Sequence, residues 1–322
     1  MMIATTLVTI MAVFFTALVQ LLLLLTVAPL VSGLIKTLKA RLQIRRGPGI
    51  LQPYRDLYKL FRKGMVLPDT ASWIFAATPY VVFATTAIAG LMIPMISARA
   101  PLGLFGGVLA VVYLLGLGRF FLALAGLDTG SGFGGLGSSR EMTIAALAEP
   151  AMMLAVFTVA IGANSTSLSE IAKVATSSTW HFLAPAQMLA FAALFIVLIA
   201  ETGRIPVDNP ATHLELTMIH EAMILEYSGP YLGLIEWGAS IKQLLLMTLL
   251  INAFLPFGLH AAWSLGGLLV SLAYLLLKLL VLAVAIVLVE TTNAKMRFFR
   301  VPDLLAMAFT LAALGLVSTF LF

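Results

Sequence analysis

Long apolar runs alternate along the chain with short stretches that collect charge, glycine and proline. A hydrocarbon core of about 30 Å requires roughly 20 apolar residues in a helix that rises about 1.5 Å per residue. Windows of this length predict eight membrane helices, near 3–35, 73–97, 102–126, 141–163, 181–202, 232–257, 263–290 and 302–321. The break between the second and third windows depends on Pro94, Arg99 and Pro101, which interrupt the apolar run.

One polar stretch carries a helical pattern of its own. In residues 49–64, GILQPYRDLYKLFRKG, apolar side chains recur at helical spacing and charged ones fall on the other faces. This pattern predicts an amphipathic helix that lies on lipid headgroups or receives a peripheral protein. We therefore expect an all-α integral membrane protein, with about eight transmembrane helices plus a cytoplasmic amphipathic helix, in a single polytopic domain over 1–322.

Composition supports this class and limits the chemistry. Hydrophobic residues make up 61% of the chain and charged residues 10%, and the mean hydropathy is +1.07. The first apolar run lacks a basic start and a cleavage site, so we expect it to remain as a helix. Because the sequence contains no cysteine, it offers no thiolate ligand for an iron–sulfur cluster or another metal. Electron-carrying centres are therefore expected in partner subunits.

The distribution of basic residues predicts an orientation, because basic loops stay in the cytoplasm. If residues 36–72 are cytoplasmic, 14 of the 19 Lys and Arg face that side, nine of them between Lys36 and Lys63. The cytoplasmic loops are then 36–72, 127–140, 203–231 and 291–301, and both termini face outward. The net charge of +5 reflects this asymmetry together with anionic lipid or an acidic partner, and nothing indicates nucleic-acid binding.

Ionisable residues inside the predicted spans are the first functional candidates. Glu149 lies inside the fourth span, where a carboxylate costs about 2.5–3.5 kcal/mol, and such acids commonly line ion or proton pathways. The alternative is an ion pair with Arg119 or Lys242 that only holds helices together. Lys242, inside the sixth span, needs an acidic partner for the same reason, and Glu149, Glu201 and Glu290 are the candidates.

The stretch 198–229, LIAETGRIPVDNPATHLELTMIHEAMILEYSG, concentrates further ionisable groups. Beyond Glu201 they are Arg204, Asp208, His213, Glu215, His220, Glu221 and Glu226. Carboxylates and imidazoles exchange protons near neutral pH, so the stretch suits proton uptake, although solvated loop charge explains Glu221 and both histidines equally well. Their spacing matches no metal motif. His181 and His260 lie near the span ends, which argues against haem ligation.

A glycine-rich stretch, GLDTGSGFGGLGSSR, covers residues 126–140. It lacks the lysine of a phosphate-binding loop and follows a membrane helix instead of a strand. We expect a flexible, closely packed cytoplasmic connection, with Asp128 and Arg140 paired with each other or with neighbouring charges.

Four segments in order resemble the NADH dehydrogenase subunit 1 family, which forms the heel of respiratory complex I, and its relatives in group 4 nickel–iron hydrogenases, including formate hydrogenlyase. They are ARLQIRRGPGILQPYRDLYKLF, SSREMTIAALAEP, AETGRIPVD and EYSG. The segments GRFFLALAGLDTGSGF, EWGASIKQLLL and VETTNAKMRF are similar to the hydrogenase-type branch.

The resemblance implies a non-catalytic anchor and proton-path subunit in the cytoplasmic membrane of a prokaryote. It would join hydrogenase large-subunit-like and small-subunit-like soluble proteins to antiporter-like membrane subunits. The partners would hold iron–sulfur clusters, and nickel–iron where that site is intact. The residues that match the family's functional positions by motif, and would form the proton path, are Arg140, Glu149, Glu201, Arg204, Asp208, Glu215 and Glu226. We add Asp128, Glu141, Lys242 and Glu290 to the expected path, because they lie in or beside predicted spans. The expected soluble-arm interface comprises Arg41, Arg45, Arg46, Gln52, Arg55, Asp56 and Lys59.

The sequence departs from complex I in the same loop. Where complex I has three acids after the second signature, this chain has Ala211, His213 and Glu215, and Gly64 lies near the position of another acid. Quinone use is therefore left open. The alternatives are a quinone-site subunit of a true NADH-quinone oxidoreductase, a freestanding secondary transporter, for which we find no inverted repeat, and an anchor without a proton path.

Overall fold

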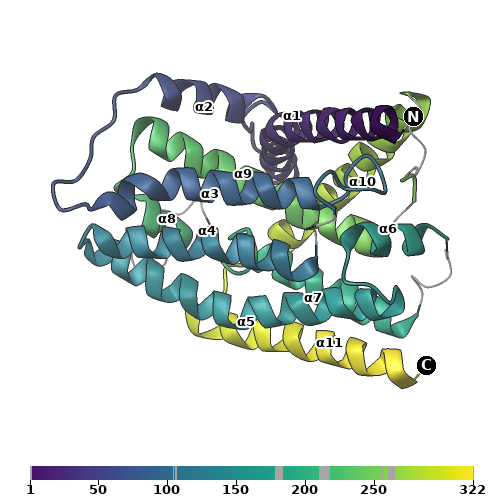
Figure 1. The fold of residues 1–322 in the computed structure, drawn as a ribbon. Coiled ribbons are helices and arrows are strands. Elements are labelled where there is room, and N and C mark those ends of the chain that lie inside the picture. Colours follow the sequence, from purple (N-terminus) through teal and green to yellow (C-terminus); the bar gives the residue numbers. More distant parts are fainter. Residues whose placement is uncertain are drawn as a thin grey trace.

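The computed structural model describes residues 2–103, 105, 107–177, 184–209, 218–255, 257–259 and 265–321, which form a helical bundle (Figure 1). Its long helices are α1 (Met2–Leu42), α3 (Trp73–Met92), α4 (Val108–Asp128), α5 (Gly132–Gly162), α7 (Pro185–Glu201), α9 (Gly229–Phe254), α10 (Leu265–Thr292) and α11 (Val301–Leu321). The shorter ones are α2 (Gln52–Arg62), α6 (Leu168–Ser177), α8 (His220–Ile224) and the 3₁₀ turn η2 (Phe298–Arg300).

The eight predicted spans each correspond to one long helix. Seven are long and apolar enough to cross a membrane, and the eighth is α7, an apolar helix of 17 residues. At about 1.5 Å per residue, α7 is near the lower limit for a crossing. α1 begins and α11 ends at the same end of the bundle (Figure 1), as an even number of crossings requires. The chain is therefore a multi-pass membrane protein.

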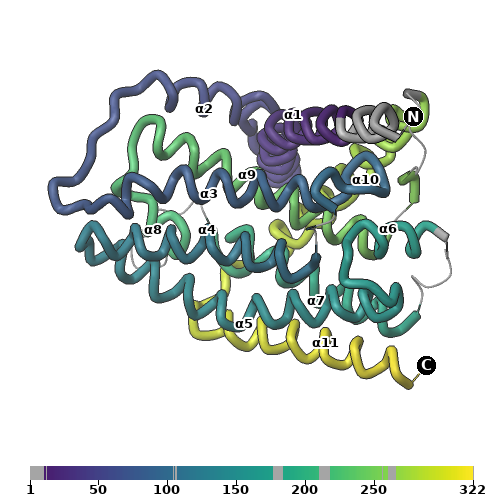
Figure 2. The backbone as a smooth tube through the Cα atoms, viewed as in Figure 1, coloured from purple at the N-terminus to yellow at the C-terminus, as the bar shows by residue number. Residues whose placement is uncertain are grey.

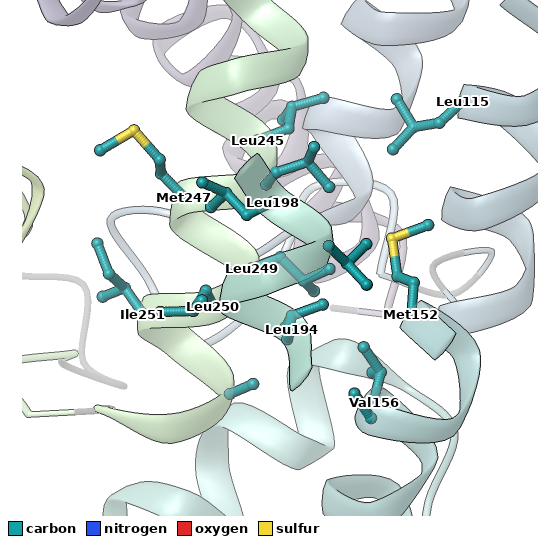
Figure 3. Packing of buried hydrophobic residues seen from close by; sticks show 14 of the residues in the cluster. Leu115, Met152, Val156, Leu194, Leu198, Leu245, Met247, Leu249, Leu250 and Ile251 are labelled. Atoms are coloured by element: carbon teal, nitrogen blue, oxygen red, sulfur yellow. The ribbon is translucent and has the colours of Figure 1, made fainter. Parts of the chain in front are cut away.

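The core forms where α7 and α9 meet the surrounding helices. α5 packs against α4, α7 and α11, α3 packs against α4 and α9, and α1 packs against α9 and α10. Leu194 and Leu198 of α7 interdigitate with Leu249 of α9 and Met152 of α5 (Figure 3). Lipid is as apolar as leucine, so this close packing contributes more to helix association than removal of apolar surface from water.

The expectation of a flexible connection over residues 126–140 is wrong. α4 continues to Asp128 and α5 already begins at Gly132, so most of this segment is helical. The glycines serve a close crossing: a Cβ on Gly134 would lie 2.2 Å from the carbonyl oxygen of Gly126, and one on Gly137 would lie 2.9 Å from that of Ile219. Tertiary contact thus overrides the low helix propensity of glycine.

The predicted amphipathic helix is confirmed as α2, and only part of its apolar face packs against the bundle. Leu57 is buried against the bundle, whereas Tyr58 and Phe61 remain 62% and 40% exposed. α1 also continues beyond the predicted end of the first span, as far as Leu42. Beyond α2, residues 63–72 lead around one end of the bundle to α3 (Figure 2).

We predict that Gly33→Ala destabilises the protein by about 1–3 kcal/mol through overpacking. A Cβ on Gly33 would lie 2.1 Å from the carbonyl oxygen of Ile50, so the chain leading into α2 would have to move. Alanine otherwise favours a helix over glycine by about 1 kcal/mol, so a loss of stability identifies the clash. Gly49→Ala is the control, since no atom lies within 4 Å of its added Cβ. Thermal unfolding in detergent that is unchanged by Gly33→Ala would contradict this close approach.

Candidate functional site

Two helices direct carboxylates at Arg119, a buried residue of α4. Its Nη2 atom lies 2.8 and 2.7 Å from the two carboxylate oxygens of Glu201, at the end of α7. Its Nη1 atom lies 3.0 Å from Oε1 of Glu149 on α5, and its Nε atom lies 3.8 Å from Oε1 of Glu141. Guanidinium is permanently charged and fork-shaped, so it can contact several carboxylates at once. We call Arg119, Glu141, Glu149, Glu201 and Lys242 the Arg119 cluster.

Lys242 of α9 completes this cluster. Its Nζ atom lies 2.7 Å from Oε2 of Glu201, which confirms the expected pairing of Lys242 with an acid. The side chain of Glu201 is only 2% exposed and contacts both cations. Glu149 is less enclosed than Glu201, because its side chain is 35% exposed. Glu149 lies at the rim of the cluster, where the absence of a side chain on Gly116 leaves room for its carboxylate.

A second cluster surrounds Glu290 at the end of α10. Oε2 of Glu290 lies 2.8 Å from Nζ of Lys39 on α1, and Oε1 lies 2.7 Å from Nη1 of Arg204. Nη2 of Arg204 also donates to Oε1 of Gln243 at 2.9 Å, and that oxygen accepts a bond from Ser32 at 3.1 Å. These contacts tie the chain after α7 to α1, α9 and α10.

Asp208 forms a third buried pair. Its Oδ1 atom lies 2.7 Å from Nζ of Lys295, and its carboxylate also accepts the backbone N–H groups of Asn209 at 2.8 Å and Ile219 at 3.2 Å. Glu201, Arg204 and Asp208, from the AETGRIPVD segment, therefore enter three adjacent polar clusters.

Asp128 and Arg140 do not pair with each other. Oδ2 of Asp128 accepts the backbone N–H of Ser72 at 2.7 Å, while Nη1 of Arg140 donates to the carbonyl of Met218 at 2.9 Å. The guanidinium of Arg140 also lies 5.5 Å from the ring centre of Phe298, a cation–π distance. Asp128 thus joins the end of α4 to the start of α3, and Arg140 joins α5 to the segments around Met218 and Phe298.

The EYSG segment separates into an exposed acid and a buried tyrosine. Glu226 is exposed on the surface. The ring of Tyr227 stacks on Phe75 at 3.9 Å, and its hydroxyl donates to the carbonyl of Phe75 at 2.9 Å. Burial raises the pKa of the Tyr227 hydroxyl well above its usual value, so this side chain acts as a neutral donor that joins the start of α9 to α3.

A cavity of about 250 Å³ lies beside the Arg119 cluster. Ten ionisable side chains line it: Lys36, Arg119, Glu141, Glu201, Arg204, Asp208, His220, Glu221, Glu236 and Lys242. Apolar side chains, among them Leu115, Leu122 and Ile235, also line the cavity.

The expected soluble-arm residues gather on one surface formed by the end of α1, the turn after it and α2. Arg41, Arg45, Arg46, Arg55 and Lys59 are exposed. Gln52 and Asp56 are half-buried and bond to each other at 2.8 Å. Other residues considered from the sequence lie outside the described residues: His181, Ala211, His213, Glu215 and His260.

The ion pair of Glu149 with Arg119, one alternative considered from the sequence, is confirmed at 3.0 Å, whereas Lys39, Gln243 and Lys295 were not predicted for the site. Arg119 had a usable signal, because a cation in the middle of an apolar helix demands partners. Lys39 and Lys295 gave no such signal, since both occur among other basic residues of predicted loops. In the described part of the chain, no three His, Asp or Glu side chains gather as a metal site would require.

We predict that Glu201→Gln lowers the free energy of unfolding by about 3–5 kcal/mol, because Arg119 and Lys242 lose their shared charge partner. The double substitution Glu201→Gln with Lys242→Gln should recover part of this loss, since it removes one uncompensated cation. Glu170→Gln is the control, because its pair with Lys173 is solvent-exposed and should contribute little. Additive effects of the two cluster substitutions in thermal unfolding would contradict direct coupling.

Comparisons with known proteins found relatives that match most of the chain. A family model described as NADH dehydrogenase matches residues 15–320. Formate hydrogenlyase subunit 4 of Escherichia coli (strain K12) is 36% identical over 304 residues, which cover 94% of this chain and 97% of the relative. Hydrogenase-4 component C of the same organism is 37% identical over 302 residues, 94% of each chain. An NADH-quinone oxidoreductase subunit of Syntrophobacter fumaroxidans is 31% identical over 295 residues, 85% of this chain and 84% of the relative.

A solved structure has the same fold. It is a chain of the membrane-bound sulfane sulfur reductase (MBS), an archaeal respiratory membrane complex, and it superposes with a TM-score of 0.84. The match covers 96% of this chain and 99% of that chain, at 23% identity, and so supports the fold alone. The family model and the relatives above 30% identity confirm the resemblance found in the sequence: this chain belongs to the NADH dehydrogenase family, as a relative of the heel subunit of complex I.

Proposed function

We propose that this chain anchors a hydrogenase-like soluble electron-transfer arm in the membrane and provides a proton path that couples it to antiporter-like membrane subunits. The names of the relatives from formate hydrogenlyase and hydrogenase-4 support the hydrogenase-type assignment. The arm and the ion-pumping subunits would be separate chains. Iron–sulfur clusters, and nickel–iron where present, would reside in the arm.

The charge balance of the Arg119 cluster carries this proposal. Arg119 and Lys242 contribute two positive charges, while Glu141, Glu149 and Glu201 contribute up to three negative charges. Three carboxylates gathered around one guanidinium place groups that can take up and release a proton next to one another. Arg119 cannot release a proton and would hold the carboxylates in place. The carboxylates would be the groups that carry it.

The positions of the acids suggest a direction through the chain. Glu141 and Glu201 line the cavity, together with His220 and Glu221, whereas Glu149 lies outside its lining and is 35% exposed. Protons would enter from the cavity, reach the Arg119 cluster and leave through Glu149 towards a neighbouring membrane subunit. The basic surface around α2 would face the cytoplasm and both termini would face outward, in the cytoplasmic membrane of a prokaryote.

We predict that Glu149→Gln allows assembly but abolishes most proton movement. Arg119 keeps its two contacts with Glu201, so the cluster should remain folded, while the rim position loses its exchangeable proton. Electron transfer and proton uptake should be measured together in vesicles that contain the assembled complex. Glu170→Gln serves as the control, because its exposed pair lies outside the cluster. Proton uptake at the wild-type ratio to electron transfer would exclude Glu149 from the path.

We predict that Arg45→Glu combined with Arg46→Glu releases the soluble arm. Both side chains are exposed on the basic surface, where reversed charge would repel acidic groups of a partner. The arm retained after membrane purification should be quantified at low and high salt. Arg99→Glu is the matched control, an exposed arginine between α3 and α4. Full retention of the arm by the double variant would assign this surface to lipid instead.

A further inference from the structure

The turn that ends α1 holds a residue unsuited to its backbone conformation. The turn is a Schellman motif, in which the N–H of Arg45 donates to the carbonyl of Ala40 at 2.8 Å and that of Ile44 to Arg41 at 3.0 Å. Ile44 has a φ angle of 57°, in the left-handed region. A β-branched residue is an outlier there, because its Cβ substituents crowd the backbone.

Two other helix ends in the described part of the chain use the same motif with suitable residues. α7 ends through Gly203 at φ 58°, with a closing hydrogen bond of 3.0 Å, and α5 ends through Asn164 at φ 50°, with one of 3.1 Å. Glycine and asparagine are the residues that tolerate this conformation. Formation of the cap therefore does not explain an isoleucine at position 44.

Burial does not explain Ile44 either. Its side chain is 96% exposed, and the residues from Arg41 to Ile50 are all exposed. An apolar side chain in a strained conformation gains nothing from this chain's own core. Such strain is commonly associated with function, where the surrounding structure holds a residue in an otherwise sparsely populated conformation.

The surrounding chain fixes Ile44 in place. Oγ1 of Thr37, on α1, donates to the carbonyl of Pro48 at 2.9 Å, so the returning chain is bonded to the helix that it leaves. A Cβ on Gly47 would lie only 2.4 Å from Cβ of Ala40, which shows how closely the two segments pack. Ile44 is thus presented in one orientation before any partner binds, which reduces the entropy lost on binding.

We propose that Ile44 is the central anchor of the docking surface and inserts into an apolar pocket, edged by carboxylates, on a water-soluble protein. This rests on the proposed function, which supplies a soluble partner. The exposed guanidinium groups of Arg41, Arg45 and Arg46 surround Ile44 in the sequence and match such an acidic rim. A lipid surface accepts an apolar side chain in many orientations and would gain little from a fixed, strained backbone.

Ile44→Gly separates docking from folding, because the two roles predict opposite effects. Glycine suits the left-handed position, so the thermal midpoint of the full chain in detergent should stay unchanged or rise. Retention of the soluble subunits by the purified complex should fall by roughly tenfold or more, as for a central interface residue. Asn164→Gly is the matched control, since it makes a similar change in the same motif of another helix and should leave retention unchanged.

Ile44→Cys provides a second measurement, because the native sequence contains no cysteine and the new thiol can be labelled selectively. A polarity-sensitive fluorophore at this site should shift to the blue in membranes that contain the soluble subunits, but not with the chain alone in vesicles of phosphatidylcholine and phosphatidylglycerol. A blue shift with the chain alone would overturn the proposal in favour of lipid insertion. Wild-type retention by Ile44→Gly would also overturn it and leave the proposed function standing. A wild-type complex without any soluble subunit would overturn both.

Discussion

The need to compensate Arg119 inside the bundle constrains much of the structure. Its guanidinium cannot be neutralised by losing a proton, and an unpaired charge in low dielectric would be costly. α5 and α7 must therefore approach α4 closely enough for Glu149 and Glu201 to reach Arg119 at hydrogen-bonding distance. Lys242 then brings α9 to the same point. The charges specify which helices meet at this level, while the apolar core between α7 and α9 supplies close packing around them (Figure 3).

The three buried clusters balance one another when their charges are considered together. The Arg119 cluster has a surplus of one negative charge if all its carboxylates are ionised, whereas Glu290 is shared by two cations, Lys39 and Arg204. Asp208 and Lys295 form a neutral pair. Lys242 and Gln243, which are consecutive on α9, contact the first and second clusters respectively. Opposite surpluses on adjacent clusters reduce the overall cost of burying these groups.

The sequence was sufficient to predict the number and approximate position of the membrane helices, because apolar runs of bilayer length are a strong signal. It also predicted the need for an acidic partner of Lys242, but could not choose among Glu149, Glu201 and Glu290, which lie on different helices. The helical start of α5 was missed because its glycines have low helix propensity, and only the close contacts of Gly134 and Gly137 with distant segments explain it. The pairs Lys39–Glu290 and Lys295–Asp208 were missed for a related reason, because long-range contacts of cations in loops leave no local pattern in the sequence.

The segment from Glu290 to Phe298 contacts residues 204–208, which follow α7, at several points. These contacts suggest how protonation of one cluster would affect the neighbouring segments. Glu290 forms an ion pair with Arg204, Lys295 forms one with Asp208, and the N–H of Met296 donates to the carbonyl of Pro206 at 2.9 Å. Proton binding by the Arg119 cluster would remove its negative surplus and thereby weaken its attraction for the surplus cation near Glu290. Residues 204–208 follow Glu201 of the Arg119 cluster directly in the chain and bond to Glu290 and Lys295 of the other two clusters. On the proposed proton path, this short segment is the element through which protonation inside the bundle would affect the chain at its surface.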